Sequence, residues 1–287
     1  MTTSTHAPAP ALPPYTAPQR VTQTRVLRSE WTKMRTQRSV VWALLSTIVL
    51  IIGFGFLYAL LRESHPPHDP ASFRSFDPTA ISLAGVNLAQ LAIGVLGVLL
   101  ITNEYSSGLI RASFAAVPSR LPILWAKAIA LVLTTVALCI PATFAAFLIG
   151  QSVLSTQHLD VTLSQPGVTR AVLGSALYLG GVGLLGLGLG ALLRNTAGAI
   201  SALFGALFGV QLLVGFLPGA WSDEITRYLP SPAGVAVTAV MRDPLSLSPW
   251  TGLGVFLAYP AVVLALAAYW MRPRRVGGGF ARVGVRK

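Results

Sequence analysis

Long apolar runs alternate with short polar connections along most of the chain. Six runs reach about 20 residues, the length that an α-helix needs to cross a hydrocarbon core about 30 Å thick. None shows the alternation of apolar and polar residues that is typical of barrel strands, and unpaired backbone groups are costly in lipid, so each run is predicted to be helical. The pattern predicts an all-α polytopic membrane protein with six transmembrane helices at about residues 40–61, 81–102, 123–150, 171–193, 197–217 and 250–271.

Composition agrees with this pattern. The 287 residues are 53% hydrophobic and only 10% charged, whereas about a quarter of the residues in soluble domains are charged. The formal charge of +12 resides at the ends and in the connections between runs. The basic residues therefore set the orientation in the membrane, and we expect no nucleic-acid partner. The single cysteine, Cys139, excludes a disulfide within the chain.

The basic residues also predict the orientation of the spans. With six spans both termini lie on one side, and that side carries 16 Lys and Arg against five on the other. The positive-inside rule then places both termini in the cytoplasm. Arg outnumbers Lys by 18 to 3, a bias typical of GC-rich bacterial genomes. We therefore expect a multi-pass protein of the bacterial cytoplasmic membrane.

The region before the first run divides into two parts. Residues 1–19 are rich in Pro, Thr and Ala without charge, which predicts a disordered cytoplasmic tail. Residues 20–38 are basic and place Leu27, Trp31 and Met34 at helical spacing, which predicts an amphipathic helix in the headgroup plane. A plain basic flank of the first span is the alternative. The residues assigned to the interfacial helix are Glu30, Trp31, Lys33 and Arg35.

Polar residues inside the runs distinguish between transport mechanisms. None of the runs has an Asp, Glu, His, Lys or Arg in its middle, where an ion-coupled carrier usually keeps one. Asn87, Gln90, Gly94 and Gly97 share one face of the second run, and Gln211 lies in the fifth. Small and amide side chains at this spacing indicate close helix packing. A substrate route lined by Asn87, Gln90 and Gln211 is the alternative.

Glycines are concentrated in the fourth and fifth runs. Gly186 and Gly190 match the G-x-x-x-G pattern, as do Gly205 and Gly209. This pattern lets helix backbones approach closely, although it is frequent by chance in glycine-rich spans. We interpret both pairs as helix-packing sites, either within one chain or at a seam between two copies.

Motifs for catalysis are missing from the sequence. None of the three lysines follows a glycine, so the chain has no P-loop for ATP. The segment His65-Pro-Pro-His68-Asp69 could form part of a metal site, but two histidines split by a proline pair without further ligands are a weak signal. We therefore expect no metal, cofactor-binding or catalytic residues. The chain is thus predicted not to be an enzyme. The long connection at residues 218–249 contains the apolar segment 235–241, which is too short to span and is either an interfacial or re-entrant helix or a flexible loop.

Four motifs in order resemble those of type-2 ABC exporter permeases. They are Glu30-Trp-Thr-Lys-Met-Arg35, Asn103-Glu-Tyr-Ser-Ser-Gly-Leu-Ile-Arg111, Pro118-Ser-Arg120 with Lys127, and Tyr228-Leu-Pro-Ser-Pro-Ala-Gly234. The likeness covers about residues 26–270. It implies a six-span permease domain at 39–271, and the positive-inside count predicts a basic cytoplasmic tail at 272–287. Two departures are the second proline of the last motif and the short external loops, and both leave the substrate class open.

The resemblance also implies partners and a coupling segment. The permease would pair with a second permease, identical or paralogous, and with two copies of a separate P-loop ATPase that binds ATP and magnesium. If the helix of the second span continues through residues 103–116, Glu104 and Arg111 fall on one face and Tyr105 on another. A charged face toward the cytoplasm suits docking to the ATPase, whereas a helix end that only marks the interface is the alternative. The residues assigned to coupling are Asn103, Glu104, Tyr105, Ser107, Gly108, Arg111 and Arg120.

Together these features predict the permease subunit of an ATP-driven exporter. Its substrate would be a small or amphiphilic compound, and membrane lipid would surround the spans. A secondary carrier driven by an ion gradient is one alternative. A membrane scaffold or sensor that transports nothing is another.

Overall fold

The computed structural model describes residues 23–65, 76–106, 121–241 and 245–271, and all the regular secondary structure within them is helical. Six helical stretches are long and apolar enough to cross a membrane, which confirms the predicted number. The predicted tails at 1–19 and 272–287 lie outside the described residues, as does His68. The six candidate spans are Arg38–Glu63, Val86–Tyr105, Leu121–Gln157, Val168–Leu193, Thr196–Val214 and Pro249–Met271.

Several spans consist of more than one helical segment. A π-helical turn interrupts the first span and another interrupts the fifth, while the second span starts only at Val86, after a separate short helix. The chain enters the first span at a corner, where Gln37 has an extended backbone between two helices. In order, the elements are α1 (Gln23–Thr36), α2 (Arg38–Val49), η1 (Leu50–Phe54), α3 (Gly55–Glu63), α5 (Pro78–Ser82), α6 (Val86–Ser106), α8 (Leu121–Leu154), η2 (Ser155–Gln157), α9 (Val168–Leu193), α10 (Thr196–Phe204), η3 (Gly205–Gly209), α11 (Val210–Val214), α12 (Gly219–Thr226), α13 (Pro230–Val235) and α14 (Pro249–Met271).

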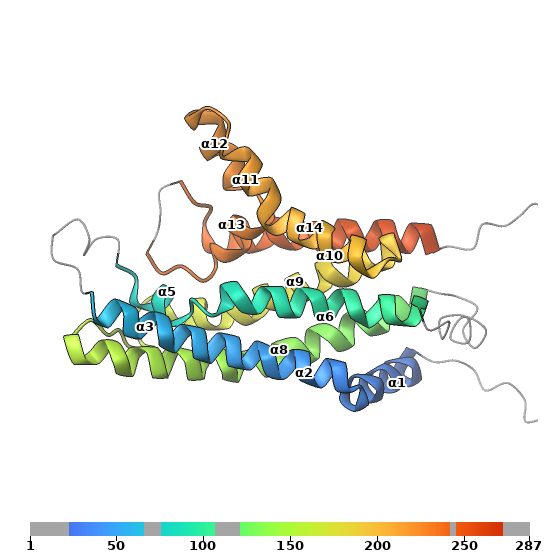
Figure 1. The fold of residues 1–287 in the computed structure, drawn as a ribbon, viewed down its shortest axis with the longest axis horizontal. Helices are drawn as coiled ribbons and strands as arrows, with labels where there is room; N and C mark the ends of the chain where they lie inside the picture. The colour runs from blue at the N-terminus through green and yellow to red at the C-terminus, as the bar shows by residue number, and fades with distance from the viewer. Residues whose placement is uncertain (1–22, 66–75, 107–120, 242–244, 272–287) are drawn as a thin grey trace, which may run out of the picture.

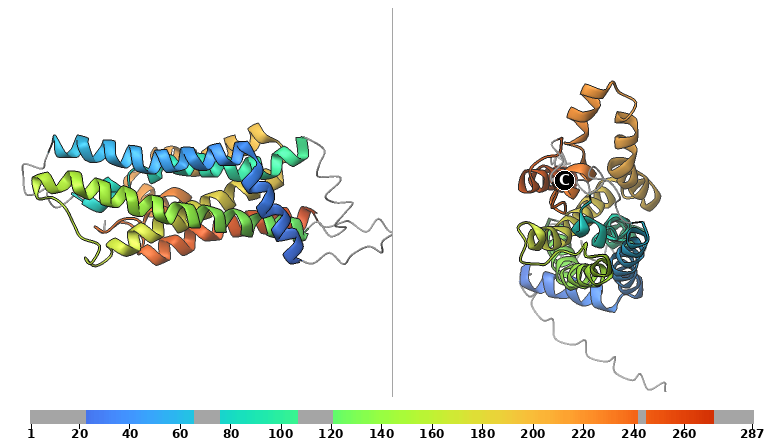
Figure 2. Two further views of the ribbon diagram at one scale, coloured as in Figure 1. Left: turned by 90° about the horizontal axis from the view of Figure 1, so that it is seen from below. Right: turned by 90° about the vertical axis from the view of Figure 1, so that its left-hand side faces the viewer.

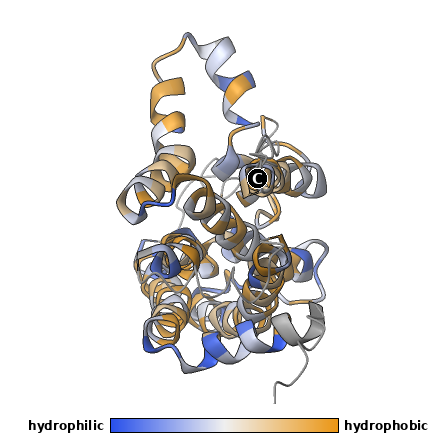
Figure 3. Ribbon diagram, turned by 90° about the vertical axis from the view of Figure 1, so that its right-hand side faces the viewer, coloured by the Kyte–Doolittle hydropathy of each residue, from blue (hydrophilic) through white to orange (hydrophobic). Residues whose placement is uncertain are grey.

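The spans form an elongated bundle whose two ends differ (Figure 1). Helix α1, the last turns of α6, the first turns of α8 and the last turns of α14 gather at one end, which we call the α1 end. The last turns of α3 and α8 lie at the other end, and we call it the α13 end because α5 and α13 lie on that half of the bundle. Viewed from the α1 end, the spans are mainly hydrophobic and α1 carries hydrophilic stretches (Figure 3).

Helix α9 occupies the centre of the bundle and packs most closely against α6. In the apolar window of its span 72% of the residues are buried, compared with 22% in the window of the fifth span. Glycines permit the close approach, because a Cβ on Gly97 would lie 2.2 Å from the carbonyl oxygen of Gly183 and one on Gly186 equally close to that of Gly94. The predicted packing role of Gly186 is thus fulfilled within the chain.

Two charged side chains hold the connection that follows α13. One carboxylate oxygen of Asp77 caps α5, and the other accepts hydrogen bonds of 3.0 Å from the backbone N–H groups of Val240 and Met241. Arg170 donates to the carbonyl oxygens of Val237 and Ala239. These contacts use backbone groups that a helix would pair internally, which explains why residues 236–241 form turns and the helix covers Pro230–Val235 instead.

The fifth span departs from the bundle at its α13-end half (Figures 1 and 2). Leu212, Leu213 and Phe216 are 69%, 68% and 82% exposed. A Cβ on Gly205 or Gly209 would meet nothing within 4 Å among the described residues. The second glycine pair therefore makes no close packing contact with the described part of its own chain.

Candidate functional site

Helix α1 lies against the start of α8 at the α1 end (Figure 2). Glu30 and Met34 are four residues apart and both buried, with Leu27 partly buried beside them. Such positions share one face of a helix. Two members of the predicted apolar stripe, Leu27 and Met34, therefore contact the bundle, and a carboxylate is buried between them. The third, Trp31, stays 37% exposed.

Four charged side chains from three helices form one ion cluster at this end. The ammonium of Lys127, in the second turn of α8, lies 2.6 Å from Glu30 Oε2 and 2.8 Å from Oε1 of Glu104 on α6. Lys33 lies 2.7 Å from Glu30 Oε1 and 3.4 Å from Glu104 Oε1. Two carboxylates thus alternate with two ammonium groups. We call these four residues the ion cluster, and it joins α1 to the second and third spans.

The ion cluster has a buried side and an exposed side. The side chains of Glu30 and Lys127 are 5% exposed and that of Glu104 is 13% exposed, whereas that of Lys33 is 49% exposed. Buried ions are costly unless they are paired. The pairing is complete except at Glu104 Oε2, which is buried and has no hydrogen-bond partner among the described residues. Glu104 itself is two residues before Ser106, where the described part of α6 ends.

Pairing decides the charge state of the two cluster residues on α1. Burial alone would raise the pKa of Glu30, but the ammonium groups of Lys127 and Lys33 outweigh it, and the pKa is held below its ordinary value of 4.5. Burial would lower the pKa of Lys33, yet Glu30 and Glu104 raise it above 10.5. Both side chains are therefore charged at neutral pH, and the contact is ionic.

Acidification is expected to weaken the attachment of α1. Because the folded-state pKa of Glu30 is lowered, its contribution to stability is present above pH 4.5 and is lost as the pH falls through the lowered value. The thermal unfolding midpoint of the wild type should exceed that of Glu30→Gln by a constant margin between about pH 5 and 8, and the margin should shrink below about pH 4.5. Glu224→Gln, at an exposed pair with Arg227, is the control. A margin that persists unchanged at pH 3 would contradict the ionic contact.

A second contact joins α9 to the same end of the bundle. Arg194 ends α9 in the left-handed conformation (φ 54°). Its guanidinium lies 5.7 Å from the ring centroid of Tyr105, the residue that follows Glu104. A cation over an aromatic ring at this distance contributes about 0.5–1 kcal/mol at an exposed site. The fourth span is therefore also linked to the last turn of α6.

The structure places only part of the predicted coupling segment. Asn103, Glu104 and Tyr105 lie in the last turns of α6, each half-buried. Of the predicted interfacial residues, Glu30 and Lys33 belong to the ion cluster, and Trp31 and Arg35 lie on α1 away from it. The remaining predicted coupling residues, Ser107, Gly108, Arg111 and Arg120, lie outside the described residues.

Lys127 is the residue whose role was not predicted from the sequence. It entered only as a member of a motif and as a basic residue of the connection, yet it is 4% exposed and occupies the centre of the ion cluster. A signal was available: Lys127 stands alone in the apolar stretch Ile123–Ala130. A lone lysine within a span needs a counter-charge, and Glu30 and Glu104 are the only acidic residues in the segments assigned to the cytoplasmic side.

The amide side chains predicted within the spans take different positions. Gln90 is 1% exposed, and its side-chain oxygen accepts a hydrogen bond from the hydroxyl of Tyr178 on α9. This bond supports packing of α6 against α9. Asn87 and Gln211 are exposed on the surface of the bundle. Gln90 thus lies in the core of the bundle, whereas Asn87 and Gln211 face outward.

Comparison with protein families decides what kind of protein carries this fold. A family model described as ABC-2 family transporter protein matches residues 26–187, more than half of the chain. The chain belongs to the ABC-2 transporter membrane family. A comparison with curated proteins finds no match.

This ABC-2 protein is thus a multi-pass membrane protein and a permease subunit of an ABC transporter. The family is a membrane transport component rather than a catalyst, and its members normally pair with an ATPase subunit. The matched region includes all four residues of the ion cluster. The fifth and sixth spans lie outside it.

Proposed function

We propose that this permease exports a small or amphiphilic compound, driven by ATP hydrolysis on a separate P-loop ATPase that docks at the α1 end. The observation that carries the proposal is the ion cluster, in which Lys127 bridges α1 and α6. Docking at residues 103–120 would place the ATPase beside this bridge. ATP and magnesium would be bound by the partner chain.

The ion cluster suggests how movement of the ATPase reaches the spans. A force on the connection between the second and third spans acts on the last turn of α6 and the first turns of α8. Since Glu104 and Lys127 are paired with Glu30, α1 would follow the same movement. Packed helices and ion pairs transmit displacement when the element they form has two alternative arrangements. The inward-open and outward-open states would be these two arrangements.

The orientation rests on charge. The segments that the sequence assigns to one side, which include α1, carry 16 of the 21 Lys and Arg residues, and this favours the cytoplasm for that side and for both termini. A P-loop ATPase that uses cytoplasmic ATP would then meet the ion cluster directly. We assign the protein to the bacterial cytoplasmic membrane on the same grounds.

Transport should require both the ATPase and the ion cluster. In proteoliposomes containing the permease and its ATPase, replacing the P-loop lysine of the ATPase should abolish substrate movement. Glu104→Gln should lower ATP-driven movement about tenfold, since it removes one of the charges that hold Lys127. Glu224→Gln at the opposite end is the matched control, and the amount of inserted protein is measured for each variant. Arg111→Ala tests the part of the coupling segment outside the described residues.

Two outcomes would reject this function. Transport that survives with the inactive ATPase and responds to a proton or sodium gradient would indicate a secondary carrier. No transport with an active ATPase, and no stimulation of ATP hydrolysis by the permease, would indicate a scaffold or sensor. Normal transport by Glu104→Gln would show that the ion cluster does not take part in coupling, and the exporter assignment would still hold.

We further propose that the second permease copy packs on the fifth span. Its exposed apolar side chains and the open face at Gly205 and Gly209 provide a surface for close helix contact. In a Cys139→Ser background, Leu212→Cys and Leu213→Cys should crosslink two copies in membranes. Leu133→Cys on α8 is also exposed and serves as the control. Equal crosslinking at all three positions would contradict a seam on the fifth span.

A further inference from the structure

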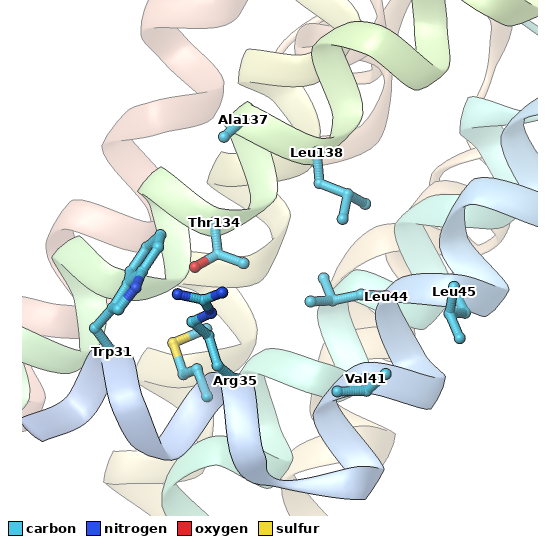
Figure 4. A pocket seen from close by; sticks show the side chains of 9 residues that line it. Trp31, Arg35, Val41, Leu44, Leu45, Thr134, Ala137 and Leu138 are labelled. Atoms are coloured by element: carbon cyan, nitrogen blue, oxygen red, sulfur yellow. The ribbon is translucent and has the colours of Figure 1, made fainter.

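A groove runs along the outside of the bundle beside the corner between α1 and α2. Its volume is about 590 Å³, within the range of roughly 300–1,000 Å³ that is common for ligand sites. The walls come from α1, α2 and α8 (Figure 4). The lining side chains are mainly apolar, and Trp31, Val41, Leu44, Leu45 and Leu138 contribute most of them.

The groove opens on the surface that faces lipid. Val41 and Leu45 line it and are 39% and 46% exposed, and Trp42 beside them is 71% exposed. These side chains continue the exposed apolar surface of the first span toward Val49. A molecule in the groove would therefore come from the membrane, because the open side is bounded by membrane-facing side chains rather than by polar ones.

One cation lies inside the groove. The guanidinium of Arg35 points into it between Trp31 and Leu44 (Figure 4). No hydrogen bond or ion pair joins Arg35 to another residue of the described part. The other polar side chain of the lining, Thr134, donates its hydroxyl to the carbonyl oxygen of Ala130. Arg35 is thus the charged group in the groove that is available to a ligand.

A second cation lies next to the groove. Arg38 lines an adjoining hollow that shares Val41 and Leu45 with it. The two arginines flank the corner at Gln37, where the backbone is extended and α1 changes direction into the span. Positive charge at the α1 end of the groove and apolar walls along the span form an amphiphilic site.

We propose that this groove binds one anionic phospholipid of the leaflet that meets the α1 end. Guanidinium groups bind phosphate oxygens through two parallel hydrogen bonds, so the headgroup phosphate would lie on Arg35 with Arg38 beside it. An acyl chain would extend between α2 and α8 over Leu44 and Leu138. The bound lipid would fill the space between α1 and the spans and hold α1 against the bundle from the side opposite the ion cluster.

Native mass spectrometry of the full-length protein in mild detergent tests the site. The protein is titrated with phosphatidylglycerol or with phosphatidylcholine of the same acyl chains. We expect one saturable adduct with phosphatidylglycerol at concentrations that give little adduct with phosphatidylcholine. Arg35→Gln should weaken the adduct about fivefold, the loss expected for one cation near an anionic headgroup. Arg28→Gln, two turns earlier on α1 and outside the groove, should leave it unchanged.

A second pair of variants tests the apolar part. Ala137 is exposed and lines the groove, so Ala137→Trp fills it without disturbing the core. It should remove the saturable adduct, whereas Ala265→Trp, an exposed position on α14, should not. Equal binding of the two lipids, or an adduct unaffected by both Arg35→Gln and Ala137→Trp, would overturn the proposal. Loss of the adduct in Arg28→Gln to the same extent would replace the site with general attraction to a basic helix.

Discussion

Lys127→Met is expected to cause the largest loss of stability among substitutions in the ion cluster. The ammonium of Lys127 lies closer than that of Lys33 to each of Glu30 and Glu104, and its removal leaves two buried carboxylates with only Lys33 between them. Breaking a buried ion pair by removing one partner costs about 3–5 kcal/mol. We expect a lower thermal unfolding midpoint in detergent and faster proteolysis at Arg28, because α1 loses its ionic attachment.

Lys33→Met is the matched control. Lys33 contacts the same two carboxylates, but its side chain is half exposed, and exposed ion pairs contribute only about 0–1 kcal/mol. The triple variant Glu30→Gln, Glu104→Gln, Lys127→Met removes charge from both sides and should recover part of the loss, since replacing a buried pair with neutral groups is often tolerated. Equal effects of Lys127→Met and Lys33→Met would show that burial does not set the strength of the cluster.

The same set of variants separates stability from coupling. In the proposed exporter, the triple variant should remain folded yet lose ATP-driven transport, because α1 would no longer follow the movement of α6 and α8. Stimulation of the ATPase by substrate is the second measurement. A triple variant that is stable and transports normally would show that the ion cluster holds α1 in place without taking part in coupling.

The sequence predicted the number of spans because each needs a long, mainly apolar run, and length and hydropathy are local properties. The segments assigned to the cytoplasmic side contain Glu30 and Glu104 as their only acidic residues, but nothing in the sequence predicted that the two side chains meet. The pairing through Lys127 was not predicted. Residues 30, 104 and 127 come together only when three helices pack, and no local pattern specifies which of their faces meet.

The structure of the connection that follows α13 could not be predicted from local sequence either. The apolar segment 235–241 was open between helix and loop, and neither propensity nor periodicity decides between them. The outcome depends on Asp77 and Arg170, which come from distant parts of the chain and bind backbone groups of residues 237–241. Likewise the two G-x-x-x-G pairs are identical as patterns, yet one lies in the centre of the bundle and the other faces outward.

That difference between the glycine pairs gives the second large expected effect. Gly186→Ala should destabilise the protein strongly, because the new Cβ would lie 2.2 Å from the carbonyl oxygen of Gly94 and 3.3 Å from the backbone nitrogen of Val98. Backbone atoms of α6 cannot rotate away as a side chain can, so α6 and α9 must separate. Overpacking of a tight interior costs about 1–3 kcal/mol and sometimes more. Gly97→Ala, 2.2 Å from the carbonyl oxygen of Gly183, should behave in the same way.

Alanine substitution at Gly205 or Gly209 should not lower the stability of the single chain and should raise it slightly. A Cβ on Gly205 or Gly209 meets nothing within 4 Å in the described part of the chain, so no contact is strained. Alanine in place of a helical glycine removes conformational freedom from the unfolded chain and stabilises by roughly 0.5–1 kcal/mol. The thermal midpoint of the single chain in detergent should therefore fall for Gly186→Ala and stay level or rise for Gly209→Ala. Falls of equal size at both positions would contradict the packing of α6 against α9.

The glycine contact also bears on the ion cluster, because α6 carries both. Gly94 and Gly97 set how closely α6 approaches α9, and Glu104 lies two turns further along the same helix. An α6 displaced by a methyl group at Gly186 would move Glu104 relative to Lys127, whose 2.8 Å contact tolerates little shift. Gly186→Ala should then impair the attachment of α1 as well as the core, and proteolysis at Arg28 should accelerate as in Lys127→Met. If proteolysis at Arg28 were unchanged in a destabilised Gly186→Ala protein, the ion cluster would adjust independently of the centre of the bundle.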